Sequence, residues 1–175
     1  MYNSRPNGVG KFKGGNYLPK NRDKFYKLNK EGGVYYRSSY EQKVLIFLDL
    51  NEDITLVAVE HLAIPYVLKK VDKYNSLISE SSHQYFVDFY YELKMQDGST
   101  KRVALEVKPK QQTVPPSFKE TSKMSKKQLE SYKWAIDEWN KNMSKWTYAI
   151  EYCKQKGIFF KIITEDEIKR LFIKI

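Results

Sequence analysis

The chain has 175 residues, of which 41% are hydrophobic and 15% aromatic, so it is long enough for one domain with a full core and too apolar for a disordered polymer. Its 31 Lys and Arg against 21 Asp and Glu give a formal net charge of +10, which favours a polyanionic partner. Cys153 is the only cysteine, which excludes an internal disulfide, and no apolar run approaches the roughly 18 residues of a membrane span. We therefore expect a soluble intracellular protein that has no membrane partner.

Residues 1–33 are rich in Gly, Asn and Lys and show no periodic apolar face. Before Glu31 they hold eight basic residues and one acid, Asp23. This composition predicts a basic N-terminal arm over residues 1–33, followed by one domain over residues 34–175. The arm either holds a polyanion or is a tail without a task of its own, and its aromatic residues offer places to dock on the domain.

The first predicted helix runs from Ser38 to about Asn51. It begins with the capping-box spacing of a serine and a glutamate three residues later, and apolar residues follow at helical spacing. β-branched and apolar residues then predict strands over 55–60 and 66–71. The polar stretch over 72–82 predicts an exposed loop.

The second half of the chain predicts two strands, over 84–95 and 101–107, joined by an Asp97-Gly98 turn of the kind that closes hairpins. Apolar periodicity and stop signals predict the later elements, which are a helix over 125–143, a helical run over 144–157, a strand over 158–163 and a helix from 164. This order of elements predicts an α/β fold with a mixed sheet flanked by helices.

The predicted hairpin brings two carboxylates together. Counted from the turn, Asp88 and Glu106 lie within one residue of direct opposition. Opposed Cβ atoms are about 4.5–5.5 Å apart, which is close enough for two carboxylates to share one hard cation. Lys108 lies on the same face as Glu106, because side chains alternate along a strand. The pattern predicts a divalent metal site with an ammonium beside it, which suits phosphodiester hydrolysis.

A carboxylate and a lysine two residues apart on a strand also form ordinary solvated ion pairs, which contribute little. The flanking residues favour the metal site, because Phe86, Phe89 and Leu105 indicate a buried strand pair, where an unpaired charge is strongly disfavoured. Glu60 follows a predicted strand and is a candidate accessory ligand.

Asp88 followed by Glu106-Val107-Lys108 resembles the PD-(D/E)xK nuclease pattern, with Val87 where the name of the pattern has proline. Longer segments resemble the head-completion nucleases of large tailed phages, which are similar to the endonuclease subunit of heteromeric bacterial transposases. These segments are YRSSYE at 36–41, AIPY at 63–66, HQYFVDF at 83–89, EVKPKQQT at 106–113 and GIFFKIITE at 157–165. The resemblance covers most of the chain, except that the stretch over 69–82 is longer than the family's usual loop.

The resemblance implies a restriction-endonuclease-like fold, in which Asp88 and Glu106 bind Mg²⁺, with Mn²⁺ as an alternative, and Lys108 is the catalytic lysine. Glu41 matches the additional acidic residue of the transposase-type enzymes. Its position in a capping box explains a glutamate there without catalysis, so both interpretations of Glu41 stay open.

Lysines after the hairpin and around the start of the long helix are candidates for binding DNA phosphates. They are Lys110, Lys119, Lys123, Lys126 and Lys127. A solvated lysine face is the ordinary alternative on a surface helix. The basic arm and the nuclease pattern favour phosphate binding.

The resemblance implies a metal-dependent DNA endonuclease that processes packaged DNA ends during phage head completion. Its substrate would be double-stranded DNA, its partners portal or neck proteins, and its location the host cytoplasm and the virion. The alternative is a non-catalytic DNA-binding or structural head-completion protein that keeps the fold for its shape. A transposase or repair endonuclease is a further alternative, which needs a partner subunit or a structure-specific substrate.

Overall fold

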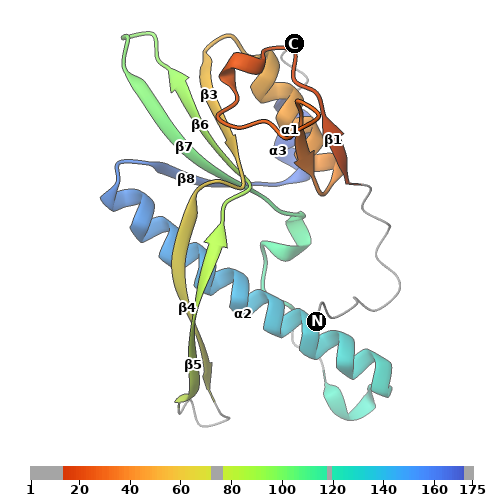
Figure 1. The fold of residues 1–175 in the computed structure, drawn as a ribbon. Helices are drawn as coiled ribbons and strands as arrows, with labels where there is room; N and C mark the ends of the chain where they lie inside the picture. Colours follow the sequence, from red (N-terminus) through yellow and green to blue (C-terminus); the bar gives the residue numbers. More distant parts are fainter. Residues whose placement is uncertain (1–13, 72–76, 118–119, 172–175) are drawn as a thin grey trace.

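The computed structural model describes residues 14–71, 77–117 and 120–171. In these residues a run of successive strands separates the first α-helix from the long helix α2, which crosses the molecule below the main sheet (Figure 1). The strands are β1 (Gly15–Tyr17), β2 (Val34–Tyr36), β3 (Ile54–Val59), β4 (Ala63–Val71), β5 (Leu77–Phe86), β6 (Phe89–Lys94), β7 (Thr100–Val107) and β8 (Phe159–Ile163). The α-helices are α1 (Ser39–Leu50), α2 (Lys126–Gln155) and α3 (Glu165–Leu171), and short 3-10 turns are η1 (Arg22–Lys24), η2 (Lys110–Gln112) and η3 (Thr121–Lys123).

The main sheet has the strand order β3-β6-β7-β8. β3, β6 and β7 pair antiparallel, with the separate β4–β5 hairpin inserted between β3 and β6, whereas β8 pairs parallel to β7 after the crossover through α2. The sheet is therefore mixed and flanked by helices, which confirms the predicted restriction-endonuclease-like α/β architecture. None of the helices in the described residues is long and apolar enough to cross a membrane.

Alternate residues of the central strand β7 pack against opposite faces of the sheet. Leu105 lies in one core with Leu45 of α1. Ala104 lies in a second core with Ala149 of α2. Because Glu106 follows Ala104 by two residues, its side chain belongs to the α2 side of the sheet. The alternation that builds the two cores therefore also directs the acidic residue toward α2.

Two predictions about the strands before the turn were wrong. The stretch over 72–82 was expected to be a loop, but β5 already begins at Leu77, and residues 72–76 lie outside the described residues. The polar residues of β5 are held in a strand because they pair with β4 along its whole length. The strand expected over 84–95 is interrupted at Val87 and Asp88, so that β5 belongs to the projecting β4–β5 hairpin and β6 to the main sheet (Figure 1).

The two helices predicted over 125–157 are one continuous helix, α2. Ser125 caps it with a full capping box, in which its side chain accepts a hydrogen bond from Gln128 N and the Gln128 side chain accepts one from Ser125 N. Ser144, where the second run was expected to begin, donates its hydroxyl to the carbonyl of Val67 at 2.6 Å instead of ending the helix. This contact fixes the middle of α2 against β4.

Residues 14–33 of the expected arm lie against the domain. β1 pairs with β2, and Phe25 is buried in the core that α1 covers. The buried carboxylate of Asp49 on α1 accepts hydrogen bonds from the hydroxyl of Tyr17 at 2.6 Å and from the backbone N–H groups of Lys20 at 2.7 Å and Asn21 at 2.9 Å. One acidic side chain therefore ties this segment to the first helix.

Candidate active site

The register of the β6–β7 hairpin places Asp88 opposite Glu106. Phe89 pairs with Leu105, and the ladder continues without a shift to the turn. Continuing this register by one residue sets Asp88, just before β6, against Glu106 of β7. The chain bends at Asp88, whose carbonyl accepts a hydrogen bond from Glu60 N at 3.0 Å. The Asp88 carboxylate is held by Val107 N, which donates to Oδ2 at 2.7 Å. The predicted opposition is confirmed, and it needs no bulge.

The Glu106 carboxylate is 2% exposed and is held from two sides. The hydroxyl of Tyr85 donates to Oε2 at 2.5 Å, and the ammonium of Lys108 lies 2.7 Å from Oε1. Lys108 is partly buried, with 22% of its side chain exposed. These contacts bring Glu106 and Lys108 together on one face of β7, as the alternation along the strand predicts.

Two carboxylates in a buried site disfavour full ionisation. Burial and the neighbouring charge of Glu106 raise the pKa of Asp88 well above its ordinary value, and the Lys108 charge and the Val107 N–H only partly oppose this. Burial lowers the pKa of Lys108, but the charges of Glu106 and Asp88 outweigh it and leave that pKa above the ordinary value. The site therefore has a deficit of positive charge around Asp88, which a bound cation would supply.

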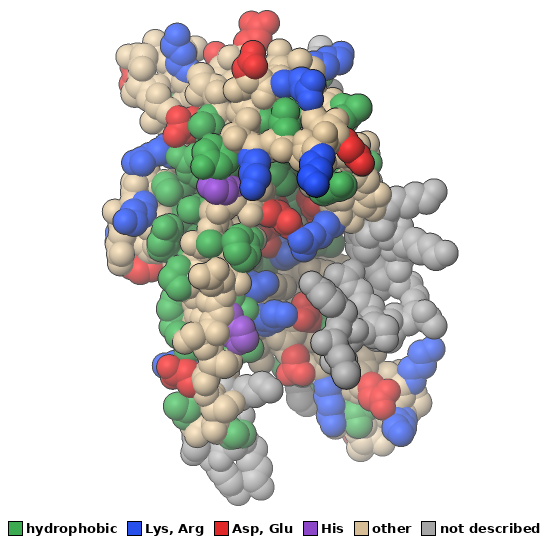
Figure 2. All heavy atoms as spheres, in the orientation of Figure 1, with side chains coloured by type: hydrophobic (Ala, Val, Ile, Leu, Met, Phe, Trp, Pro, Cys, Tyr) green, Lys and Arg blue, Asp and Glu red, His purple; other side chains and the backbone are tan. Residues whose placement is uncertain are grey.

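The three groups open into a cavity of about 470 Å³. The cavity is lined from several elements: β5, the bend at Asp88, the end of β7, α2, the segment before α1 and the residue after β3. Its lining residues are Arg37, Glu60, Gln84, Tyr85, Phe86, Asp88, Glu106, Lys108 and Lys145. Figure 2 shows acidic and basic side chains side by side in the middle of this face of the molecule. The cavity is lined by both signs of charge, which suits a cation and a phosphate together.

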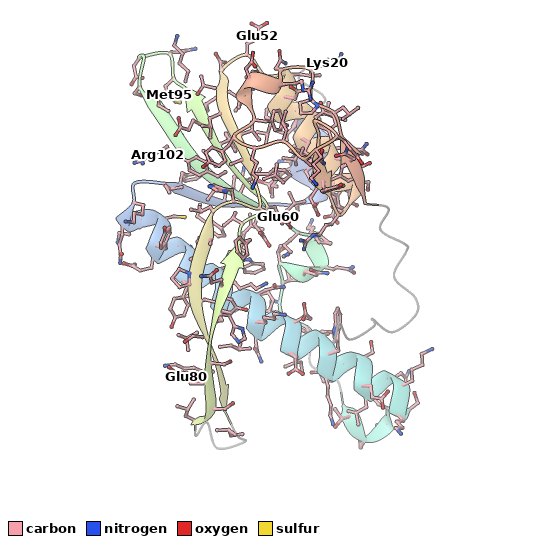
Figure 3. The ribbon with its side chains drawn as sticks, viewed as in Figure 1. Lys20, Glu52, Glu60, Glu80, Met95 and Arg102 are labelled. Atoms are coloured by element: carbon pink, nitrogen blue, oxygen red, sulfur yellow. The ribbon has the colours of Figure 1, made fainter. Side chains whose placement is uncertain are left out.

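Glu60 lies where β3 leads into β4, at the centre of the molecule in Figure 3. Its φ of 47° is in the left-handed region, which is uncommon for a residue other than glycine. Its carboxylate forms an ion pair with Arg37 at 2.8 Å, and the side chains of Arg37 and Glu60 are 77% and 39% exposed. Glu60 therefore lies on the rim of the cavity with its charge already matched, and its role as an accessory ligand stays a prediction.

Glu41 lies in the first turn of α1, and its carboxylate serves the helix cap. Oε1 accepts the hydroxyl of Ser38 at 2.8 Å, and Oε2 accepts the backbone N–H of Arg37 at 2.7 Å. Its charge still acts on Asp88 and Lys108, since it is among the causes that raise the pKa of each. Glu41 is therefore close enough to influence the site while its oxygens are engaged in capping, and its catalytic role stays a prediction.

The residues present fit a divalent cation held by two carboxylates. Hydrogen bonding to Asp88 within the described residues uses Oδ2, which leaves Oδ1 for another ligand. No cluster of three or more His, Cys, Asp or Glu side chains suited to a metal ion occurs in the described part of the chain. Mg²⁺ suits such a site, because one or two carboxylates, waters and a substrate phosphate complete its coordination.

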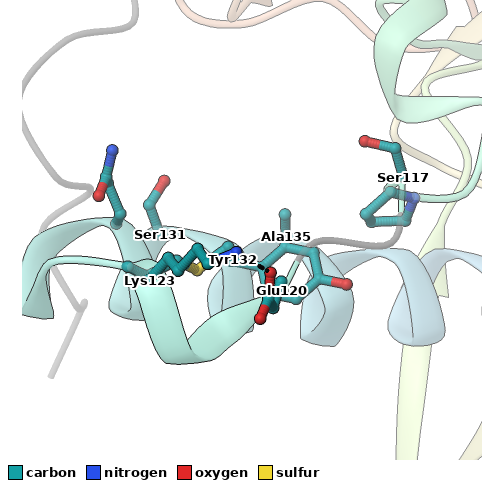
Figure 4. Close-up of a pocket in the computed structure, with 9 residues that line it drawn as sticks. Ser117, Glu120, Lys123, Ser131, Tyr132 and Ala135 are labelled. Atoms are coloured by element: carbon teal, nitrogen blue, oxygen red, sulfur yellow. Dashed lines mark ion pairs between the residues drawn. The ribbon is translucent and has the colours of Figure 1, made fainter.

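Four of the lysines predicted to bind DNA are described by the structure, and none of these four, Lys110, Lys123, Lys126 and Lys127, lines this cavity. Lys110 forms an ion pair with Asp166 at 2.9 Å, and Lys123 forms one with Glu120 at 2.9 Å. Lys126 and Lys127 are exposed in the first turn of α2, and Lys119 lies outside the described residues. Lys123 lines a second hollow of about 530 Å³ beside the start of α2, together with Tyr132 and Ser131 (Figure 4). The DNA-binding role of these lysines stays a prediction.

Five residues that line the cavity were not functional candidates in the sequence analysis, and they are Arg37, Gln84, Tyr85, Phe86 and Lys145. Tyr85 precedes Asp88 by three residues, so period two in a continuous strand would place the two side chains on opposite faces. The interruption of the strand at Val87 and Asp88 changes this, and the hydroxyl of Tyr85 reaches Glu106. Arg37 and Lys145 carry no local signal, since Arg37 precedes α1 and Lys145 lies on α2, and only the tertiary fold brings them to Asp88.

Comparisons with known proteins identify the family of the chain. Residues 51–165 match the family described as TnsA-like endonuclease N terminal, a segment that contains Asp88, Glu106 and Lys108 and lacks Glu41. The chain is 30% identical over 163 residues to the "Head completion nuclease" of Enterobacteria phage T4, and the alignment covers 91% of this chain and 96% of that protein. No solved structure is significantly similar to the chain. The chain therefore belongs to the family of TnsA-like endonuclease N-terminal domains.

Proposed function

We propose that this protein is a metal-dependent DNA endonuclease that processes packaged DNA ends while a phage head is completed. The observation that carries the proposal is the convergence of Asp88, Glu106 and Lys108 on one cavity, with Lys108 Nζ 2.7 Å from Glu106 Oε1. The T4 relative is named a head completion nuclease, which supports the biological setting. We expect double-stranded DNA as the substrate, portal or neck proteins as partners, and the host cytoplasm and the virion as locations.

In this proposal Asp88 and Glu106 hold Mg²⁺, or Mn²⁺ in its place. When bound, the ion supplies Lewis-acid polarisation of the phosphate and of water. Asp88 offers Oδ1, while the Val107 N–H fixes Oδ2 and thereby the orientation of the carboxylate. Lys108 is anchored beside Glu106, from where its ammonium can orient the attacking water or stabilise charge that develops on the phosphate.

Tyr85 holds Glu106 in this arrangement. The hydroxyl donates to Glu106 Oε2, and burial together with the Glu106 charge keeps the pKa of Tyr85 above its ordinary value, so the phenol stays protonated and remains a donor. We expect Tyr85→Phe to lower cleavage about tenfold and to raise the Mg²⁺ concentration needed for half-maximal rate, because the carboxylate loses its orienting donor. A Mg²⁺ titration of the cleavage rate for both proteins measures this. An unchanged titration curve would show that Tyr85 only fills space.

The proposal as a whole is tested by incubating the purified protein with closed circular DNA. We expect nicking with Mg²⁺ or Mn²⁺ and none with EDTA. The rival is a DNA-binding structural protein without catalysis. DNA binding of normal strength without cleavage under either metal would support that rival and contradict the enzyme.

The biological part of the proposal is tested separately with linear duplexes that differ only at their ends. Processing of packaged ends predicts faster cleavage near a protruding or single-stranded end than in the interior. Equal cleavage along the whole duplex would leave the nuclease in place and remove the argument for end processing.

A further inference from the structure

We propose that Lys145 and Lys141 of α2 form a phosphate-binding track that leads the DNA backbone into the active-site cavity. The proposal rests on the proposed function for the identity of the polyanion. It assigns a role to two lysines that the metal chemistry does not use, and it names α2 as the element that guides the substrate.

Lys145 is a second cation inside the cavity. It lines the cavity with Asp88, Glu106 and Lys108, although it belongs to a helix far along the chain. Its ammonium lies 5.3 Å from the ring centre of Tyr85. The neighbouring residue Ser144 is bonded to β4, so this part of α2 is fixed relative to the site. The ammonium is therefore placed by the fold and is not merely carried by a mobile surface chain.

The charge of Lys145 lacks a close counterpart. In the described ranges it makes no ion pair with a carboxylate, whereas Lys108 is paired with Glu106 and Arg37 with Glu60. Burial and the charges of Lys108 and Lys141 hold the pKa of Lys145 below its ordinary value. A half-buried ammonium beside other cations is stabilised by an anion, and a phosphate oxygen is the anion that a nuclease brings to this place.

Lys141 continues the positive charge along the same side of α2. It precedes Lys145 by four residues, which places both on one face of the helix. Lys127 and Trp134 lie at further steps of seven residues on this face, and both are exposed. From Lys127 to Lys145 the helix rises about 27 Å, which matches the length of about eight base pairs. This face of α2 is thus long enough to follow the DNA backbone from the N-terminal end of the helix to the cavity.

Two acidic residues, Glu130 and Glu138, also lie on this face, and Glu138 is the one nearer to the cavity. The Glu138 carboxylate is 3.8 Å from Lys141 Nζ, and these two side chains are 40% and 42% exposed. An exposed pair at this distance is weak, so a phosphate competes readily for the lysine. Beside the cavity, where Lys141 and Lys145 lie, the face of α2 therefore keeps its positive character toward DNA despite the Glu138 carboxylate.

The test compares Lys145→Gln and Lys141→Gln with Lys154→Gln. Lys154 is an exposed lysine nine residues after Lys145, which places it half a turn away on the opposite side of α2. All three variants remove one charge from the same helix. Binding of a labelled duplex in EDTA is measured by fluorescence anisotropy between 50 and 200 mM salt, taken as about the range over which phosphate contacts weaken strongly.

We expect Lys145→Gln and Lys141→Gln each to reduce the slope of log affinity against log salt by about 0.9, because each removes one phosphate contact. The affinity advantage of the wild type then shrinks about 3.5-fold across that range. Lys154→Gln is expected to keep the wild-type slope. Unchanged slopes in the two track variants, or an equal fall in Lys154→Gln, overturn the proposal.

Two further measurements keep the result interpretable. Lys145→Arg retains the charge and is expected to restore the slope, and Lys141→Gln tests the track even if Lys145→Gln is poorly folded.

Cleavage by Lys141→Gln is expected to show a raised KM with kcat unchanged, since a remote phosphate contact binds ground state and transition state alike. If the lysine variants show the expected smaller slopes but the wild type never cleaves DNA, the nuclease proposal is wrong and the phosphate-binding track stands. If the wild type cleaves DNA but the lysine variants keep the wild-type slope, the track is wrong and the nuclease proposal stands.

Discussion

Asp88→Asn is expected to reduce DNA cleavage by about 10³-fold or more while the protein remains folded and binds DNA. The loss corresponds to several kcal/mol of transition-state stabilisation. The bound cation supplies this stabilisation, and the neutral amide of Asn would not hold the cation as the carboxylate does. The fold should become more stable, because the substitution removes one of two carboxylates that repel each other across the hairpin, where burial and the charge of Glu106 raise the pKa of Asp88. Activity and stability thus change in opposite directions.

Single-turnover cleavage and thermal unfolding of the same preparation measure both effects. Glu106→Gln is expected to lose activity to a similar extent, and Lys154→Gln serves as a folded control outside the site. A melting temperature that falls together with activity would mean that Asp88 supports the structure and would remove it from the chemistry. Wild-type cleavage by Asp88→Asn would remove the proposed metal ligand altogether.

Asp49→Ala is expected to destabilise the protein by about 3 kcal/mol and to release the segment that carries β1 and η1 from α1. The buried carboxylate accepts hydrogen bonds from Tyr17, Lys20 and Asn21, and its removal leaves these donors without a partner. Asp53→Ala is the matched control, because Asp53 is an exposed acid just after α1. Chemical denaturation of both variants measures the difference, and equal stability of the two would show that Asp49 does not hold this segment against α1.

The same residue predicts a dependence of stability on pH. Burial alone would raise the pKa of Asp49, but the hydrogen bonds from Tyr17, Lys20 and Asn21 outweigh it and hold that pKa below its ordinary value. A folded-state pKa below the unfolded one means that the contribution is complete above the unfolded pKa, near about 4, and is lost as the pH falls through the folded value. Wild type and Asp49→Ala should therefore converge in stability at acid pH. A difference in unfolding free energy between the two proteins that stays constant as the pH falls would contradict a lowered pKa of Asp49 in the folded state.

The core of the candidate site was predictable because it is encoded locally. The Asp97-Gly98 turn fixes the hairpin, and a fixed hairpin decides which residues oppose each other and which face Glu106 shares with Lys108. The same locality explains why the helix that begins after Ser38 and the strand before α3 were found. In each case a cap or a short apolar run carries the signal within a few residues.

The remainder depends on contacts between distant segments. The serine-rich start of β5 has weak strand propensity, and it becomes a strand because β4 pairs with it. Ser144 reads as a break in a helical pattern, yet the hydroxyl finds an acceptor on β4 and the helix continues. Lys145 enters the cavity only because α2 packs across the β4–β5 hairpin, and no spacing in the sequence relates it to Asp88.

The central claim is that Asp88 and Glu106 together bind a divalent cation. Crystals grown with Mn²⁺ and measured for anomalous scattering test it most directly. The account predicts one strong peak in the cavity, about 2.2 Å from an oxygen of each carboxylate, and no peak there in Asp88→Asn. A wild-type enzyme that cleaves DNA while Mn²⁺ occupies a different place, or no place, would contradict it.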